Sequence, residues 1–223
     1  MKHRMQTAGT YRHSGAFFRQ LDAYALAAGA AGVSLLALTE PAEARIVYTP
    51  VHKVIGNGES YKLDFNRDGI TDLTIRNIAT QSCGTDGTCW PIESLAAALS
   101  GTNQVVYNIY GAVAMKSGMR VGPGDAFNGG RVRMVGSWGS FATGSWINVK
   151  NRYLGVKFKI KGKCHFGWAR LNVQLQPPRQ VTATLAGYAY ETIVGKAIIA
   201  GKEHGEDDGV EPATLGSLAL GRK

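Results

Sequence analysis

The chain has 223 residues, 44% of them hydrophobic, and a mean hydropathy of −0.11. This composition predicts one soluble globular domain and excludes a protein with many membrane spans, because beyond the amino-terminal region no segment is apolar enough to cross a bilayer. The formal net charge is +9, and residues 45–200 hold 18 Lys and Arg against 8 Asp and Glu. A folded body with this charge favours a polyanionic partner.

The first 44 residues have the pattern of an export signal. Basic residues precede an apolar, alanine-rich run over residues 23–38, and small side chains follow at Ala42 and Ala44. Signal peptidase accepts only small residues at those two places, so we expect cleavage after Ala44 and a mature chain that starts at Arg45. The protein would then be secreted or held in the cell envelope. Two alternatives are a start codon further along the chain and an uncleaved anchor.

The mature region alternates apolar and polar residues at a period of two, which is typical of half-buried strands. The alternation predicts strands over residues 45–49, 60–65, 72–77, 104–110, 111–116, 153–161, 165–174, 181–191 and 196–200. Their spacing predicts an all-β fold, specifically an antiparallel β-sandwich of the jelly-roll type over residues 45–200. Residues 91–99 consist of good helix formers and predict one short surface helix. Residues 201–223 are expected to form a disordered tail.

Residues 117–146 are dense in glycine, which predicts a long, ordered loop region. Four aromatic side chains are scattered through it: Phe127, Trp138, Phe141 and Trp146. Such side chains either stack on sugar rings or bases, or pin the loop to the domain.

Two of the three cysteines, Cys83 and Cys89, are separated by a short polar segment that contains two glycines. A disulfide between them agrees with export, because oxidising compartments preserve such bonds. A reduced or metal-binding pair is the alternative. Cys164 lies within an apolar strand pattern and is expected to be a small buried hydrophobe.

Residues 64–73 read D-x-N-x-D-G-x-x-D-L and place oxygen-bearing side chains around one tight turn. Calcium prefers six to eight oxygen ligands at roughly 2.3–2.6 Å, and this segment can converge several on one point. An EF-hand loop counted from Asp64 would need a bidentate Glu at its twelfth position, where Ile75 stands, so that assignment fails. The alternative is an ordinary Asp/Asn/Gly hairpin turn.

The same segment resembles the calcium loops of dockerin modules, thrombospondin-type repeats and FG-GAP repeats. The resemblance implies a set of calcium ligands made of four side chains and one backbone carbonyl: Asp64, Asn66, Asp68, Asp72 and the carbonyl of Ile70. Because strand-like residues flank the loop, the FG-GAP-like geometry between two strands is favoured. We expect the ion to be structural, since it would relieve the repulsion among three carboxylates.

The carboxy-terminal residues 210–223 contain an E-P dipeptide, an apolar stretch and a basic end. This order resembles the sorting tails of the PEP-CTERM class of exported bacterial proteins. The apolar stretch is too short to span a bilayer, and a disordered tail without a sorting role is the alternative. The strand-like residues 153–173 and 187–191 resemble segments of uncharacterised exported bacterial proteins with such tails, which implies no activity.

Lysine alternates with other residues near the middle of the mature chain, at Lys157, Lys159, Lys161 and Lys163. On one strand these side chains would project from a single face while Phe158 and Ile160 turn inward. The resulting basic stripe could hold acidic polysaccharide, lipid phosphate or nucleic acid, of which the first two are nearer to an exported protein. Alternatively, the lysines protect an exposed edge strand from aggregation.

Catalytic signatures are mostly absent: the chain has no H-E-x-x-H, G-x-S-x-G or phosphate-binding G-x-x-x-x-G-K-S/T. We therefore expect an exported, calcium-stabilised structural or adhesive module of the envelope or extracellular matrix, with acidic polysaccharide as its expected ligand and no nucleic acid. The alternative is a glycan-acting hydrolase or lyase that uses a carboxylate such as Glu191 or Asp125. A third interpretation, an intracellular nucleic-acid binder, requires that residues 1–44 are not an export signal.

Overall fold

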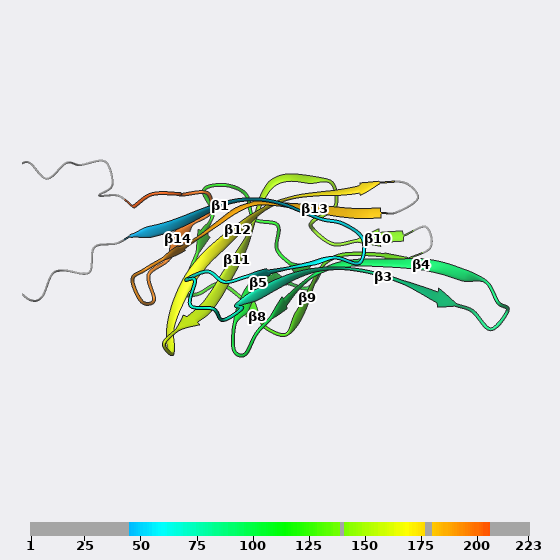
Figure 1. Cartoon of the computed structure of the whole chain (residues 1–223), viewed down its shortest axis with the longest axis horizontal. Helices are drawn as coiled ribbons and strands as arrows, with labels where there is room; N and C mark the ends of the chain where they lie inside the picture. The colour runs from blue at the N-terminus through cyan, green and yellow to red at the C-terminus, as the bar shows by residue number, and fades with distance from the viewer. Residues whose placement is uncertain (1–44, 139–140, 177–179, 206–223) are drawn as a thin grey trace, which may run out of the picture. The chain divides into compact units, whose positions relative to one another are not determined.

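Figure 1 shows the computed structural model, which describes residues 45–138, 141–176 and 180–205. The described residues form two antiparallel sheets packed face to face, with no helix, so the prediction of an all-β, sandwich-like fold is confirmed. It follows that they include no helix able to cross a membrane. The predicted export signal and most of the predicted tail lie outside the described residues.

The first sheet has the strand order β1-β13-β12-β11-β5-β6, and β8 pairs with β5. β13 alternates buried and partly buried residues along most of its length, whereas residues 165–169 of β12 are all buried, because both faces of the sheet are covered there. The strands are β1 (Ile46–Ile55), β13 (Gln180–Glu191), β12 (Lys163–Gln176), β11 (Val149–Ile160), β5 (Gln104–Asn108), β6 (Gly111–Ala112) and β8 (Phe127–Asn128).

The second sheet has the order β10-β9-β4-β3-β2, and β14 forms a separate pair with β7. The hairpin of β3 and β4 extends past the end of β13 as an arm (Figure 1). The strands are β10 (Phe141–Thr143), β9 (Arg131–Trp138), β4 (Cys89–Leu99), β3 (Leu73–Cys83), β2 (Ser60–Leu63), β14 (Ile198–Ile199) and β7 (Arg120–Val121).

Two apolar clusters hold the sheets in place. The main core fills the space between the sheets, where Ile75 of the second sheet and Phe158 and Leu171 of the first are fully buried. The second cluster lies on the other face of the first sheet, where Tyr153 and Trp168 pack beneath β7, β14 and nearby side chains such as Met115. The first sheet is therefore covered on both faces over part of its length.

The predicted helix over residues 91–99 is wrong, because these residues belong to β4. This strand is paired along its length with β3 and, from Ile92 onward, with β9. Helix propensity differs among ordinary residues by only about 0.7 kcal/mol each, and ladder hydrogen bonds on both sides of a strand outweigh that preference. The small side chains of Ala96, Ala97 and Ala98 suit a strand in the centre of a sheet.

The glycine-rich region is only partly a loop. It contains the eight-residue strand β9, which lies between β4 and β10 in the second sheet. Leu95 of β4 lies opposite Val135 and Ala96 lies opposite Arg133, so Met134 of β9 is an extra residue. This bulge interrupts the simple alternation of β9. The period-two pattern is broken at that point, which is why the sequence did not reveal this strand.

Candidate functional site

The segment predicted to bind calcium is the loop between β2 and β3. Leu63 and Leu73 pair at its base, so the prediction that it lies between two strands is confirmed. Phe65 is fully buried and packs against Phe158, with ring centroids 4.9 Å apart. This contact anchors the loop to the main core, while Ile70 at its tip is 66% exposed.

The acidic side chains of this loop accept hydrogen bonds from its own backbone. Asp64 accepts from the N–H groups of Asp68 (3.3 Å) and Gly69 (2.7 Å), and Asp68 accepts from the N–H of Ile70 (2.8 Å). The side-chain amide of Asn66 donates to Asp68 at 2.8 Å. These bonds are those of an Asp/Asn/Gly turn, and each carboxylate keeps further lone pairs that could face a cation.

Asp72 closes the loop from the buried side. Its carboxylate accepts from the backbone N–H of Phe65 (2.9 Å) and from the side-chain amide of Asn103 (3.1 Å). Burial raises the pKa of Asp72, and the nearby charges of Asp64 and Asp68 raise it further. The hydrogen bonds that it accepts from Phe65 and Asn103 act in the opposite direction and lower the pKa of Asp72. A divalent ion bound beside Asp72 would relieve its repulsion with Asp64 and Asp68.

Within the described ranges, no set of three or more His, Cys, Asp or Glu side chains is arranged to hold a metal ion. The oxygen chemistry of the loop fits calcium, but its present bonds are also those of an ordinary turn. Calcium coordination by Asp64, Asn66, Asp68, Asp72 and the carbonyl of Ile70 therefore stays a prediction.

The four lysines predicted to form one stripe lie in three different settings. Lys157 and Lys159 are on β11, Lys161 is in the following turn with a φ of 49°, and Lys163 begins β12 opposite Ile160. Directly opposed residues share a face, so Lys163 lies on the face of Ile160, opposite to Lys157 and Lys159. The expectation of a single stripe is wrong because the strand ends at Ile160.

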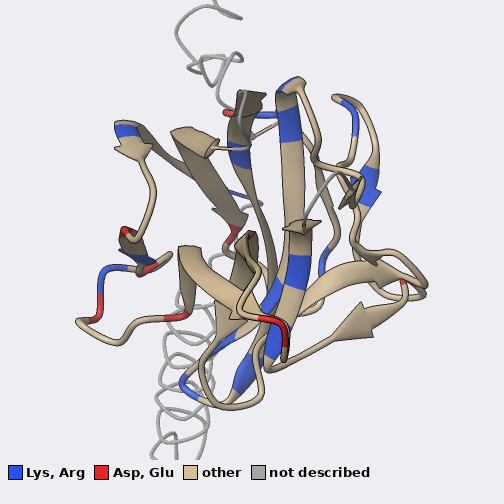
Figure 2. Cartoon of the chain, turned by 90° about the vertical axis from the view of Figure 1, so that its right-hand side faces the viewer, with Lys and Arg blue, Asp and Glu red and all other residues tan. Residues whose placement is uncertain are grey.

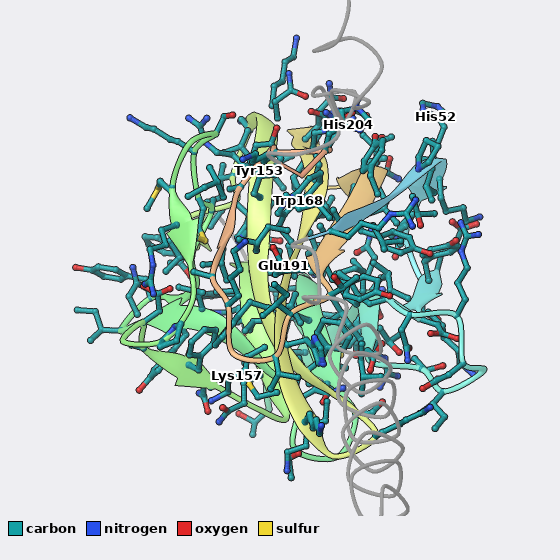
Figure 3. The ribbon with its side chains drawn as sticks, turned by 90° about the vertical axis from the view of Figure 1, so that its left-hand side faces the viewer. His52, Tyr153, Lys157, Trp168, Glu191 and His204 are labelled. Atoms are coloured by element: carbon teal, nitrogen blue, oxygen red, sulfur yellow. A yellow bond between two sulfur atoms is a disulfide. The ribbon has the colours of Figure 1, made fainter. Side chains whose placement is uncertain are left out.

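Lys157 also has a local partner: its ammonium lies 4.8 Å from the centre of the Phe127 ring. This strand is not an edge, because β11 lies between β12 and β5. The interpretation of these lysines as edge protection therefore does not hold for Lys157. Figure 3 shows Lys157 and Glu191 on the face of the first sheet that also carries Tyr153 and Trp168.

The two carboxylates considered for catalysis each have structural partners. Glu191 is 3% exposed, accepts from the backbone N–H of Ile193 at 3.0 Å and lies 3.7 Å from the Lys196 ammonium. Asp125 accepts from the backbone N–H of Gly122 at 2.8 Å, within a turn. Glu191 also lines a pocket of about 70 Å³, and the described residues around that pocket include no second carboxylate.

The cysteine prediction agrees with the structure. Cys83 and Cys89 are directly opposed in the pairing of β3 and β4 and form a disulfide at the tip of the arm. Cys164 packs against the second apolar cluster, as expected of a small hydrophobic residue, but it is half-buried rather than fully buried.

The four aromatics of the glycine-rich region divide into two kinds. Trp146 is fully buried and donates its indole N–H to the carbonyl of Ala112 at 3.0 Å, and Phe127 packs against Phe166. These two pin the chain to the domain. Trp138 is 45% exposed and Phe141 is 66% exposed, so only these two of the four remain open to a ligand.

Another basic surface lies on the second sheet, on the face turned away from the main core, which we call the outer face. Arg131 and Arg133 of β9 lie opposite Ala98 and Ala96 of β4, and Arg76 of β3 lies on the other side of Ala96. Lys62 of β2 lies opposite Thr74 in the neighbouring row. We call the four side chains of Lys62, Arg76, Arg131 and Arg133 the basic rows; all four are exposed.

The described strand residues of the outer face include no carboxylate. The side chains that share this face are Ser60, Lys62, Thr74, Arg76, Ile78, Thr80, Ser82, Trp90, Ile92, Ser94, Ala96, Ala98, Arg131, Arg133, Trp138, Phe141 and Thr143. In the part of the chain that the structure describes, no acidic residue forms an ion pair with any member of the basic rows. Figure 2 shows the wider pattern, with Lys and Arg mainly along strands and Asp and Glu mainly in loops.

The sequence contained part of this signal. Lys62, Thr74 and Arg76 occupy the polar positions of strands that were predicted, but their alignment with Arg131 and Arg133 depends on β4 and β9. One of those strands was predicted as a helix and the other as a loop.

Comparison of the chain with known protein families, curated proteins and solved structures gives no match.

Proposed function

We propose that this chain is an exported, calcium-stabilised adhesive module of the cell envelope or extracellular matrix that binds acidic polysaccharide on its outer face. The observation that carries the proposal is the set of four exposed cations without an acidic neighbour among the described residues of that face. Neighbouring strands are about 4.8 Å apart, which separates Arg133 from Arg76 by about 10 Å and Arg131 from Lys62 by about 14 Å at the backbone. A carboxylated polymer lying on this face could meet several of them at once.

The small residues between the cations support this arrangement. Ala96 and Ala98 lie on the central strand between the arginines of β9 and the cations of β3 and β2. Ala96 is 2% exposed and Ala98 is partly buried, so longer neighbouring side chains cover these short ones. An extended polymer suits such a surface better than a compact ligand, because its affinity accumulates over several weak, exposed charge contacts.

The test measures binding of the full chain to polygalacturonate, a polymer of uronic acid, over a range of salt concentrations. We expect affinity to fall as salt rises, since each contact releases counterions. Replacing Arg76 or Arg131 by Gln should weaken binding about fivefold each, the equivalent of about 1 kcal/mol. The matched control is Lys159→Gln on β11. Retained affinity in both arginine variants, or loss only in the lysine control, would overturn the assignment to the outer face.

The same preparation separates a module from an enzyme. A module leaves the polymer at its original length, whereas a hydrolase or lyase releases shorter sugars. Release that stops in Glu191→Gln or Asp125→Asn would replace the proposal with the enzymatic alternative. Amino-terminal sequencing of the exported product tests the location, with Arg45 as the expected first residue.

A further inference from the structure

The outer face carries a second feature at the end nearest the arm. Trp90 of β4, Trp138 of β9 and Phe141 of β10 are 43%, 45% and 66% exposed. Trp138 lies opposite Ile92 on one side and Phe141 on the other, and Trp90 is two residues from Ile92 along β4. All three aromatic side chains therefore share the outer face. We call this group of three the aromatic platform.

The platform is arranged as a broad surface rather than as an isolated exposed ring. The rings of Trp138 and Phe141 have centroids 6.4 Å apart and planes inclined by 34°. Single exposed aromatics are common on protein surfaces, but neighbouring ones mark binding sites because water contact with their large apolar area is unfavourable. The partly buried Ile92 lies between the two tryptophans and extends the apolar area.

Arg133 connects the platform to the basic rows. Gly136 lies on β9 between Arg133 and Trp138, and a β-carbon at that position would be only 3.1 Å from Cδ of Arg133. The arginine side chain thus lies along the outer face over Gly136, toward the platform. On β9, the side chain of Arg133 therefore occupies part of the space between its own row and Trp138.

We propose that the aromatic platform stacks on the rings of the acidic polysaccharide while the basic rows hold its carboxylates. This inference rests on the proposed function and adds that the sugar rings of the polysaccharide, and not only its carboxylates, contact the protein. The weakly positive C–H bonds on a sugar ring complement the negative face of an aromatic ring. Ile92 and Ala96 are four residues apart on β4, so the platform and the nearest basic row are about 14 Å apart. A ligand that contacts both must therefore contain several sugar units.

Charge placement favours a glycan over a single-stranded nucleic acid. Proteins that bind single-stranded nucleic acid place cations along the backbone, beside the aromatic side chains on which the bases stack. Here the row of Trp138, Ile92 and Thr80 contains no cation of its own, and the side chain of Arg133 over Gly136 is a single cation that approaches it. In an acidic polysaccharide, the ring face of one unit can stack on the platform while the carboxylates of units further along the polymer meet the basic rows.

The test compares three probes on the full chain: polygalacturonate, inorganic polyphosphate and a single-stranded oligonucleotide. Polyphosphate has the charge but no ring. We expect Trp138→Ala and Phe141→Ala each to weaken polygalacturonate binding about tenfold and to change polyphosphate binding less than about twofold. Trp138→Phe should restore most of the affinity. The thermal midpoint of each variant shows whether the fold is retained. If Trp138→Ala is unstable, Phe141→Ala provides the test, because Phe141 is the more exposed of the two residues.

The outcomes separate this inference from the proposed function. If the arginine variants lose polygalacturonate and the aromatic variants keep it, the platform is not a sugar site although the basic rows still bind the polymer. If polyphosphate and polygalacturonate weaken together in the aromatic variants, stacking is also refuted. Tighter binding of the oligonucleotide, with loss in Trp138→Ala, would assign the outer face to nucleic acid instead.

Discussion

Glu93 of the second sheet accepts a hydrogen bond from the backbone N–H of Val181 of the first sheet at 2.6 Å. Asn77, also from the second sheet, donates its side-chain amide to the carbonyl of the same residue at 2.5 Å. Both backbone groups of Val181 are therefore held by side chains from the opposite layer. Glu93 is 6% exposed and Asn77 is 1% exposed, so water cannot readily replace these bonds.

Replacing Glu93 by Ala should destabilise the domain by about 1–3 kcal/mol, because the buried N–H of Val181 would lose its acceptor. Glu93→Gln retains an acceptor oxygen and should cost less. Urea unfolding followed by tryptophan fluorescence measures both free energies. Equal destabilisation by the two substitutions would show that the carboxylate charge, rather than the hydrogen bond, matters at this position.

Tyr190 makes the free energy of unfolding of the domain depend on pH in the alkaline range. Burial raises the pKa of its phenol above the ordinary value of about 10. The unfolded chain then loses this proton first as pH rises, so the free energy of unfolding decreases from about pH 10 until the folded pKa is passed. Below about pH 10 both states are neutral and this group contributes no slope.

Tyr190→Phe should remove that part of the alkaline destabilisation while leaving stability at neutral pH nearly unchanged. Chemical unfolding at a series of alkaline pH values provides the measurement. Tyr110→Phe serves as the control, because Tyr110 is 65% exposed on a turn. An unchanged slope in Tyr190→Phe would mean that another group is responsible.

Gly155 lies where β11 passes closest to the second apolar cluster. A β-carbon at this position would be 2.7 Å from a methyl group of Val106 and 2.9 Å from the sulfur of Met115. Gly155→Ala should therefore destabilise the domain by about 1–3 kcal/mol through overpacking. Gly56→Ala is the matched control, since its nearest neighbour is a side-chain oxygen of Glu59 at 3.8 Å. Thermal unfolding of both variants should show a marked decrease only for Gly155.

The sequence predicted the strands in which apolar and polar residues alternate. β13 alternates along most of its length, and β11 and β12 alternate over residues 156–160 and 169–174, so their existence and approximate positions could be recognised from the residues alone. β4 could not, because the alanines at 96–98 carry a helical preference that only pairing with β3 and β9 overrides. The basic rows follow from that pairing, since no property of a single strand places Arg76 beside Arg131 and Arg133.

Calcium should raise the stability of the full chain if the loop between β2 and β3 binds it. At a concentration about 100 times its dissociation constant, a ligand that binds only the folded state adds about 2.7 kcal/mol, which should raise the thermal midpoint. Asp68→Asn keeps an acceptor for the N–H of Ile70 and removes one charge, so it should reduce the calcium effect without unfolding the loop. Asp86→Asn, in the turn of the arm, should leave the effect intact. A midpoint that is the same with calcium and with chelator would contradict the site.

The disulfide Cys83–Cys89 should stabilise the arm locally rather than the whole domain. Between Ile92 and the tip of the arm, β4 pairs only with β3 among the described strands, so its opening exposes little of the core. Replacing both cysteines by Ser should lower the global free energy of unfolding by less than about 1 kcal/mol but speed proteolysis within residues 84–88. Because Trp90 follows Cys89 directly, polygalacturonate affinity should fall together with this local order. A large decrease in global stability would instead place the arm within the cooperative folding unit, because a bond that closes a loop stabilises only the unit whose unfolding opens that loop.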